Sequence, residues 1–293
     1  VYNEFSSGSK DPSAIRMLAK HLWDKSDSLH RPRYLLLFGA ASYDYKGTLG
    51  QLTDFVPTFE SFFNLQEGGG TPVEDNFAYL EDLEGFSPAE SNGRGSMDIA
   101  VGRLPVRNSS DAEAVVEKID IYSHPEYLYD SRNPNLPGNF GDWRNEIAFV
   151  SDDGFESRLE TSILRNDWPS TMIPEFHVNK LYSDAYERTT SSTSNRVPGL
   201  ESNIRTSIEE GSLFIGYYGH SGWDAWSDER ILSIDIINQL NESYSFPIMS
   251  SSSCTFGYFD YINRPSAAEL LVLRPHSGAI AILTTTRTAN TGS

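Results

Sequence analysis

Helix-like and strand-like hydrophobic patterns alternate along most of the chain. The first helix is predicted after Asp11-Pro12, because apolar residues recur at helical spacing from Ile15 to Trp23; Asp11 is suited to the N-cap and Pro12 to the first turn. Further helices are predicted over 110–122, 156–164, 200–210, 234–240 and 266–273. Strands are predicted over 34–38, 99–105, 147–150, 176–182, 213–218, 247–253 and 279–285. This alternation is typical of the α/β class with a mostly parallel sheet.

A turn-rich connector separates two parts of the chain. Residues 124–144 contain three prolines and two glycines, so we place the boundary there, with one subdomain over 1–135 and a second over 136–293. In the first part, the continuous apolar run Tyr34–Phe38 ends at Gly39 and predicts a strand buried on both faces. The chain opens at Val1 without an initiator methionine or a signal peptide, and we expect it to be a fragment of a longer polypeptide.

Composition and charge exclude several classes of protein. The 293 residues include 23 Lys and Arg against 41 Asp and Glu, a formal net charge of −18, which argues against binding to nucleic-acid phosphates. Cys254 is the sole cysteine, so neither an intramolecular disulfide nor a zinc site of several thiolates can form. No apolar stretch approaches the roughly 20 residues that a membrane-spanning helix needs.

Two chemically reactive side chains follow predicted strands. His220 comes directly after the strand over 213–218, and Cys254 after the strand over 247–253. Ligands of open α/β sheets bind at the carboxyl ends of the strands, where the two side chains are expected to face each other. A thiol beside an imidazole is a nucleophile with its base. The alternatives are a hydrogen-bonded structural histidine and a cysteine that fills the core as a small apolar residue.

Glycines and carboxylates near these positions extend the hypothesis. Gly219 and Gly222 flank His220 and allow close approach of a substrate, with the N–H groups of Ser221 and Cys254 as candidate oxyanion donors.

Asp152 and Asp153 follow the strand over 147–150, where one carboxylate is placed to orient the imidazole of His220. Capping of a helix near Phe155 is the alternative role. Because the two side chains point to opposite faces, we expect one aspartate in each role, with Asp153 as the orienting residue; the reverse assignment fits the alternation equally well.

A metal site is a further expectation. The acidic residues Glu74, Asp75, Glu81, Asp82 and Glu84 offer the oxygen ligands that calcium prefers, which suggests a structural calcium ion. Their spacing fits no EF-hand loop, and a solvated acidic loop is the alternative. No metal and no cofactor is expected to be required for the reaction itself.

Several motifs, in order, resemble the gingipain-like cysteine peptidases. The most specific are Tyr-Gly-His-Ser-Gly over 218–222 and Ser-Cys-Thr-Phe-Gly over 253–257. Similar stretches occur over 34–39, 42–45, 102–105, 149–154, 258–260, 265–271 and 278–287. The resemblance implies a caspase-like α/β/α sandwich in two subdomains, the second of them catalytic. It also implies Cys254 as nucleophile, His220 as general base, and Asp152 or Asp153 as the orienting acid.

The longer stretches resemble the sortases of this family, which serve the type IX secretion system. That resemblance implies a surface protein associated with the outer membrane, which removes the C-terminal signal of secreted cargo and transfers the cargo to a glycolipid such as lipopolysaccharide. Outer-membrane secretion components are implied as partners. Two alternatives stay open: a secreted gingipain-like endopeptidase, and a surface binding module without catalytic activity.

Overall fold

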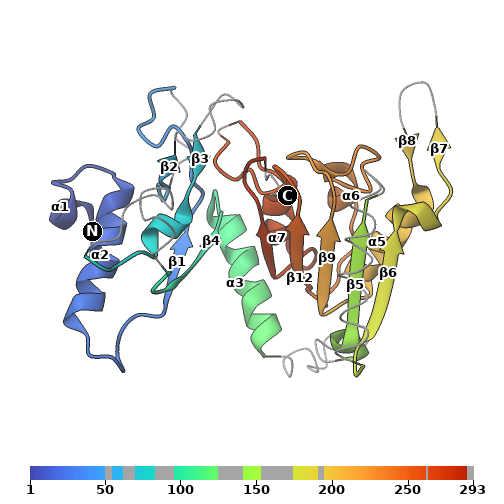
Figure 1. The fold of residues 1–293 in the computed structure, drawn as a ribbon, viewed down its shortest axis with the longest axis horizontal. Helices are drawn as coiled ribbons and strands as arrows, with labels where there is room; N and C mark the ends of the chain where they lie inside the picture. The colour runs from blue at the N-terminus through green and yellow to red at the C-terminus, as the bar shows by residue number, and fades with distance from the viewer. Residues whose placement is uncertain are drawn as a thin grey trace. The chain divides into compact units, whose positions relative to one another are not determined.

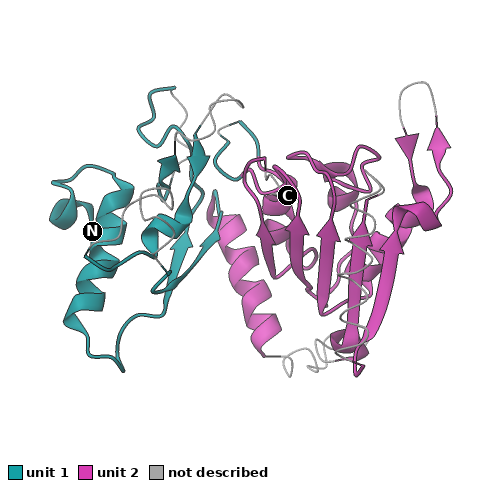
Figure 2. Ribbon diagram, viewed as in Figure 1, with its two compact units in different colours: residues 1–107, 259–264 teal, residues 108–258, 265–293 magenta. Residues whose placement is uncertain are grey.

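The computed structural model describes residues 1–49, 55–61, 70–82, 96–124, 141–152, 174–190, 195–261 and 263–288. The chain forms two compact units (Figure 2). Unit 1 comprises residues 1–107 together with 259–264, and unit 2 comprises 108–258 together with 265–293. The helix after residue 108 thus groups with unit 2. The boundary predicted between residues 135 and 136 lies outside the described residues and stays a prediction.

Unit 1 is a small α/β unit. Its helices and 3-10 turn are α1 (Tyr2–Phe5), α2 (Pro12–Lys25) and η2 (Glu74–Phe77), and its strands are β1 (Tyr34–Phe38), β2 (Glu60–Ser61), β3 (Thr71–Pro72) and β4 (Ala100–Leu104). The predicted start of α2 is confirmed, since the Asp11 side chain accepts the N–H of Ser13 at 2.7 Å. β1 and β4 pair in parallel, and β2 and β3 form an antiparallel pair.

The strand β1 is buried on one face only, so its predicted burial on both faces is wrong. Tyr34, Leu36 and Phe38 are 81%, 58% and 43% exposed, whereas Leu37 is buried. The other side of the strand carries the core, because Leu35 packs against the cluster that includes Ala19 of α2. An apolar run therefore indicates a strand, but the number of covered faces depends on the layers around it.

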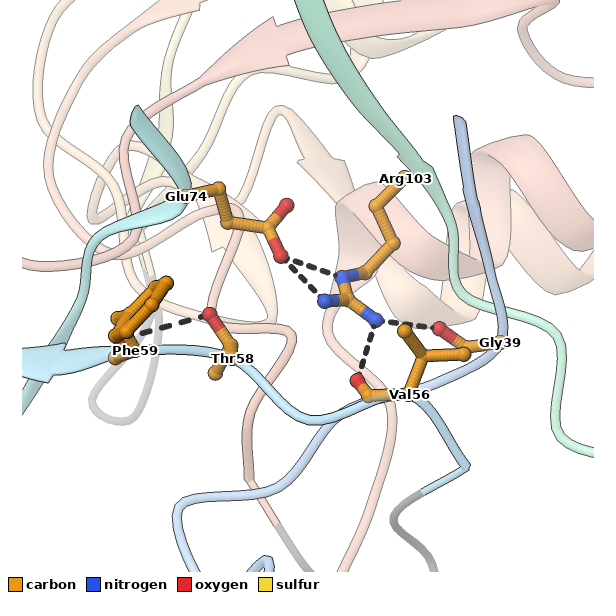
Figure 3. A network of polar contacts seen from close by, with 6 residues as sticks. All are labelled: Gly39, Val56, Thr58, Phe59, Glu74 and Arg103. Atoms are coloured by element: carbon orange, nitrogen blue, oxygen red, sulfur yellow. Dashed lines mark hydrogen bonds and ion pairs between the residues drawn. The ribbon is translucent and has the colours of Figure 1, made fainter. Parts of the chain in front are cut away.

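A buried arginine joins the strands of unit 1 to their loops (Figure 3). Arg103 of β4 donates from Nη1 to the main-chain oxygens of Gly39, at 2.6 Å, and Val56, at 2.8 Å. Its Nε donates to Oε1 of Glu74 at 2.7 Å. The one side chain thus fixes the end of β1, the segment at Val56 and the start of η2.

Unit 2 is built on a five-stranded parallel sheet with the order β13-β12-β9-β5-β6 (Figure 1). Its strands are β5 (Glu146–Ser151), β6 (His177–Tyr182), β9 (Phe214–Tyr218), β12 (Ile248–Ser252) and β13 (Ala281–Thr284). Two antiparallel pairs complete the strands: β7 (Thr189–Thr190) with β8 (Asn195–Arg196), and β10 (Ala225–Trp226) with β11 (Leu232–Ser233). The predicted α/β class with a mostly parallel sheet is confirmed.

One face of the sheet carries the main core of unit 2. Inward residues of the strands, such as Val150, Ile215 and Met249, are fully buried with residues of three helices.

The helices and 3-10 turns of the unit are α3 (Ser109–Ser123), η4 (Asp142–Asn145), η5 (Ser183–Ala185), α5 (Pro198–Glu209), α6 (Ile234–Asn238) and α7 (Ala267–Leu273). The helix predicted over 156–164 lies outside the described residues. No helix among those described is both long enough and apolar enough to span a membrane.

The helix α3 contacts α7 and contributes a buried lysine. The ammonium group of Lys118 donates to the main-chain oxygens of Val272, at 2.8 Å, Ser277, at 2.8 Å, and Ala279, at 3.2 Å. These oxygens belong to the last turn of α7 and to the segment that leads into β13. Lys118 therefore satisfies a carbonyl group at the end of α7, which the helix leaves without a partner, and two carbonyl groups of the segment that follows.

Candidate active site

His220 and Cys254 hold equivalent positions at the carboxyl edge of the sheet. Their strands, β9 and β12, are neighbours, and Tyr218 is the register partner of Ser252. His220 follows Tyr218 by two positions, and Cys254 follows Ser252 by two positions. Because parallel strands end at the same edge, the structure brings the imidazole-bearing and thiol-bearing loops side by side, as the sequence predicts.

Asp152 lies at the same edge, on the other side of β9. It follows Ser151 of β5, and Ser151 is also a register partner of Tyr218. Asp152, His220 and Cys254 therefore follow three adjacent strands in the order β5-β9-β12. Asp153, which we expect to orient the imidazole, lies outside the described residues, as does the start of the helix near Phe155.

The main chain of His220 is held from three directions. Its N–H donates to Oδ2 of Asp152 at 3.3 Å, and its carbonyl oxygen accepts the N–H of Ser227 at 2.8 Å and the hydroxyl of Tyr217 at 2.5 Å. Gly219 permits this arrangement, since a Cβ there would lie 2.4 Å from Cβ of Asp152 and 2.6 Å from the Tyr217 hydroxyl. At Gly219 the space that a side chain would need is taken by the side chains of Asp152 and Tyr217, and the predicted close approach of a substrate stays a prediction.

The carboxyl group of Asp152 is buried, with 7% of the residue exposed. The pKa of Asp152 is raised from 3.8 to about 6, mainly by burial, with smaller contributions from the negative charges of Glu229 and Asp228. The N–H of His220 and the positive charge of Arg188 act in the opposite direction. A carboxyl with these properties changes its charge in a pH range where proteins are normally folded.

Cys254 is half-buried and its loop, residues 253–258, is anchored to the end of β13. The hydroxyl of Thr285 donates to the main-chain oxygens of Ser253 and Cys254. In return, the carbonyl oxygen of Thr285 accepts the N–H of Gly257 at 2.9 Å. The nucleophile candidate therefore sits on a loop fixed on both sides of the cysteine.

The candidate oxyanion donor Ser221 lies beside β10, the first strand of the β10–β11 hairpin, and its N–H points away from that strand. Ser221 and Trp226 form an antiparallel bridge, in which the hydrogen bonds run between the flanking residues: Gly222 N–H to Ala225 and Ser227 N–H to His220. Within the part of the chain that the structure describes, no hydrogen bond uses the N–H of Ser221 or of Cys254. Both groups keep the donor capacity that an oxyanion hole requires.

Several residues that support the site carry no signal that pattern reasoning detects. Tyr217 contacts the His220 loop through its phenol, Thr285 contacts the Cys254 loop through its hydroxyl, and the indole of Trp226 contacts Ser251 of β12. Tyr217 looks like an ordinary strand residue, and Trp226 lies in a two-residue strand too short to show periodicity. Their roles depend on register and on the fold of the hairpin.

The acidic segment that we expect to bind calcium is only partly described, since Glu84 lies outside the described residues. Glu74 pairs with Arg103, and Oδ1 of Asp82 lies 2.7 Å from Nζ of Lys20. Across the described ranges, no group of three or more His, Cys, Asp or Glu side chains is arranged to hold a metal ion. The calcium site stays a prediction.

The five-stranded parallel sheet with a histidine and a cysteine at its carboxyl edge is consistent with an α/β sandwich of the caspase-like class. A family model, Peptidase family C25, matches residues 1–292, and the chain belongs to this family. The gingipain-like resemblance of the sequence motifs is thereby confirmed. No curated protein matches the chain.

Solved structures show the same fold. The Arg-specific cysteine proteinase gingipain R (RgpB) superposes with a TM-score of 0.65 at 16% identity, over 98% of this chain and 56% of that chain. A complex of the pro- and mature domains of RgpB from Porphyromonas gingivalis gives a TM-score of 0.65 at 17% identity, over 99% and 57%. A further structure, described as a protease, gives 0.66 at 11% identity, over 97% and 52%. The predicted caspase-like α/β sandwich is confirmed, and the chain spans little more than half the length of these structures.

Proposed function

We propose that this chain carries the active site of a cysteine peptidase that works by acyl transfer, with Cys254 as nucleophile and His220 as general base. The observation that carries the proposal is the equivalent placement of the two residues, each two positions beyond the register pair Tyr218 and Ser252. Membership of peptidase family C25 supports the same assignment.

The proposed reaction begins with a peptide carbonyl bound at the sheet edge. His220 accepts the thiol proton, Sγ of Cys254 forms a bond to the carbonyl carbon, and the N–H groups of Ser221 and Cys254 hold the resulting oxyanion. The carbon–nitrogen bond then breaks, and His220 protonates the departing amine. The thioester that remains reacts either with water, giving a carboxylate, or with an amine, giving a new amide; both outcomes restore the thiol.

The third role in the proposed site belongs to a carboxylate. The hydrogen bond from the main chain of His220 supports Asp152 as the residue that positions the histidine loop. Asp153 remains the candidate that we expect to orient the imidazole itself, as the third member of a triad does.

We further propose that the enzyme is a sortase of the type IX secretion system, similar to PorU. Its substrates would be secreted proteins with a C-terminal signal, its acceptor an amine on a surface glycolipid such as lipopolysaccharide, and its location the cell surface at the outer membrane. Support for this finer proposal comes from the sequence stretches over 253–260, 265–271 and 278–287. A secreted gingipain-like endopeptidase uses the same first half-reaction and is the competing proposal.

The test separates these proposals by their products. The full-length protein is incubated with a cargo protein and an amine acceptor, and the new C-termini are identified by mass spectrometry. Cargo joined to the amine supports the sortase, whereas cargo that ends in a free carboxylate despite the acceptor supports the endopeptidase. Absence of cleavage with every cargo tested, under conditions where the protein is folded, contradicts the peptidase assignment.

A further inference from the structure

Beneath the two reactive loops, a buried tryptophan connects the histidine side to the cysteine side. Trp226 of β10 is fully buried. Its ring stacks on Tyr217 with a centroid distance of 4.3 Å and an interplanar angle of 10°, and lies 5.4 Å from the ring of Phe256. Tyr217 donates its hydroxyl to the carbonyl oxygen of His220, and Phe256 belongs to the Cys254 loop. Trp226 therefore packs against one residue from each side of the site.

A chain of hydrogen bonds leads from the same tryptophan toward the nucleophile. The indole N–H of Trp226 donates to Oγ of Ser251 at 2.9 Å, and the hydroxyls of Ser251 and Ser253 lie 2.7 Å apart. Both serines are buried, with 2% and 6% of their surface exposed. Ser253 directly precedes Cys254. Because an indole has a donor and no acceptor, Ser251 is the group that satisfies it, and the bond fixes the hairpin against β12.

The hairpin that carries Trp226 also carries the histidine side of the site. Trp226 stands opposite Ser221 in the antiparallel bridge, and the next residue, Ser227, donates its N–H to the carbonyl oxygen of His220. A shift of the indole therefore moves the main chain at His220 and at Ser221 together. At the other end of the contacts lies Ser253, the residue before Cys254, so we expect the same shift to displace the Cys254 loop.

We propose that Trp226, through its indole N–H and Ser251, is a positioning residue that sets the alignment of His220 with Cys254. The inference rests on the proposed function, because it assumes that these two residues act as a pair. Neither Trp226 nor Ser251 is proposed to touch the substrate. Loss of the hydrogen bond leaves a buried donor or acceptor unsatisfied and allows the hairpin to move away from β12.

The chain offers a matched control for this tryptophan. Trp143 of η4 is also buried, at 6% exposure, and its indole nitrogen has no hydrogen-bond partner among the described residues. It lies just before β5, at the amino end of that strand, whereas the candidate site is at the carboxyl end. The substitutions Trp226→Phe and Trp143→Phe remove the same atoms from buried rings, and only the first removes an indole hydrogen bond of the described structure.

The experiment compares Trp226→Phe, Ser251→Ala, the double variant and Trp143→Phe in the full-length protein. Alkylation of Cys254 by iodoacetamide is followed across pH on its peptide by mass spectrometry, and kcat and KM are measured on a cleaved cargo peptide. We expect each of the first two variants to lower kcat about tenfold or more with little change in KM, since small misalignments of reacting groups are costly. The pH profile of alkylation should change in both, and Trp143→Phe should match the parent protein.

The double variant tests whether the two residues act through one bond. If they do, Trp226→Phe with Ser251→Ala lowers kcat about as much as either single change, because the interaction is lost only once. Effects that multiply, or a Trp226→Phe protein indistinguishable from Trp143→Phe, would overturn the proposal. Should Trp226→Phe fail to fold, Ser251→Ala removes the same bond with less loss of packing and decides the matter alone. Cys254→Ala that retains turnover refutes Cys254 as the nucleophile, whereas the alkylation comparison among the variants that keep Cys254 still reports the coupling.

Discussion

The carboxylate of Asp152, at the end of β5, accepts the main-chain N–H of His220 at 3.3 Å. The contact joins two adjacent strands at the edge where the reactive residues lie. It also gives the buried carboxylate a donor that stabilises its charge, against the desolvation that is the main cause of its raised pKa of about 6. The residue thus holds the histidine loop at a cost in folding free energy when it ionises.

Replacement of Asp152 by asparagine should make the fold more stable at pH 8. The pKa of the group is about 6 in the folded protein and 3.8 in its ordinary state, so its favourable contribution is complete below about pH 4 and is lost as the pH rises through 6. The side-chain amide of the variant keeps an oxygen for the His220 N–H and has no charge to bury. We expect a gain of up to about 3 kcal/mol in the free energy of unfolding at pH 8, measured with urea.

The gain should shrink toward zero near pH 4, where the parent carboxyl is also neutral. Asp184→Asn, a change at an exposed residue, serves as the control and should show no comparable trend. A stability difference between Asp152→Asn and the parent protein that is the same at pH 4 and pH 8 would refute the linkage.

Turnover measured on Asp152→Asn and Asp153→Asn identifies the orienting carboxylate: the variant with the larger fall in kcat lacks it, and a change of only a few-fold in both indicates a dyad.

Cys254→Ala should abolish turnover and leave the fold intact. The side chain is small and half-buried, so its removal takes away the attacking sulfur but little packing. Ser252→Ala, at an exposed position two residues earlier on β12, is the control and should remain active. Activity of Cys254→Ala with an unchanged thermal midpoint would show that another residue is the nucleophile.

His220→Ala should slow the alkylation of Cys254 by iodoacetamide at pH 7. The thiolate is the reactive form, and an imidazole that takes the thiol proton increases its population. The rate is measured on the cysteine peptide by mass spectrometry, with circular dichroism to confirm that the variant is folded. Equal rates in the variant and the parent protein would mean that the two side chains do not interact.

The sequence predicts the edge of the sheet well because the buried parallel strands have strong apolar patterns. Every predicted strand from 147–150 to 279–285 matches a strand of the central sheet, and two of them end just before His220 and Cys254. The register that places Tyr218 beside Ser252 is a property of the assembled sheet, and residue patterns do not encode it locally.

Other features depend on tertiary packing and escape the pattern. The run Tyr34–Phe38 looks the same whether one or two faces are covered, so its exposed face could not be predicted. Trp226 belongs to a hairpin of two-residue strands. Its role arises from contacts with Tyr217 and Ser251, which are separated from it in the sequence and belong to no recognisable motif with it. Supporting residues of a site are therefore harder to predict than the reactive groups, whose chemistry identifies them.

Lys118→Met should destabilise unit 2 in a manner that depends on pH. The substitution removes the ammonium that donates to the carbonyl oxygens of Val272, Ser277 and Ala279, and leaves buried acceptors without partners, at a cost of about 1–3 kcal/mol. Burial lowers the pKa of Lys118 from 10.5 to about 7, with a smaller effect from the positive charge of Arg274.

The sign of the pH dependence follows from the lower pKa in the folded state. Between about pH 7 and 10.5 the unfolded chain binds the proton and the folded protein releases it, so the contribution of Lys118 to the free energy of unfolding rises with pH over this range. The deficit of Lys118→Met relative to the parent protein should therefore be larger at pH 9.5 than at pH 7 in urea unfolding. Lys180→Met, at an exposed position on β6, is the control. A deficit that stays constant between the two pH values would show that the lysine titrates alike in both states and that its burial carries no electrostatic cost.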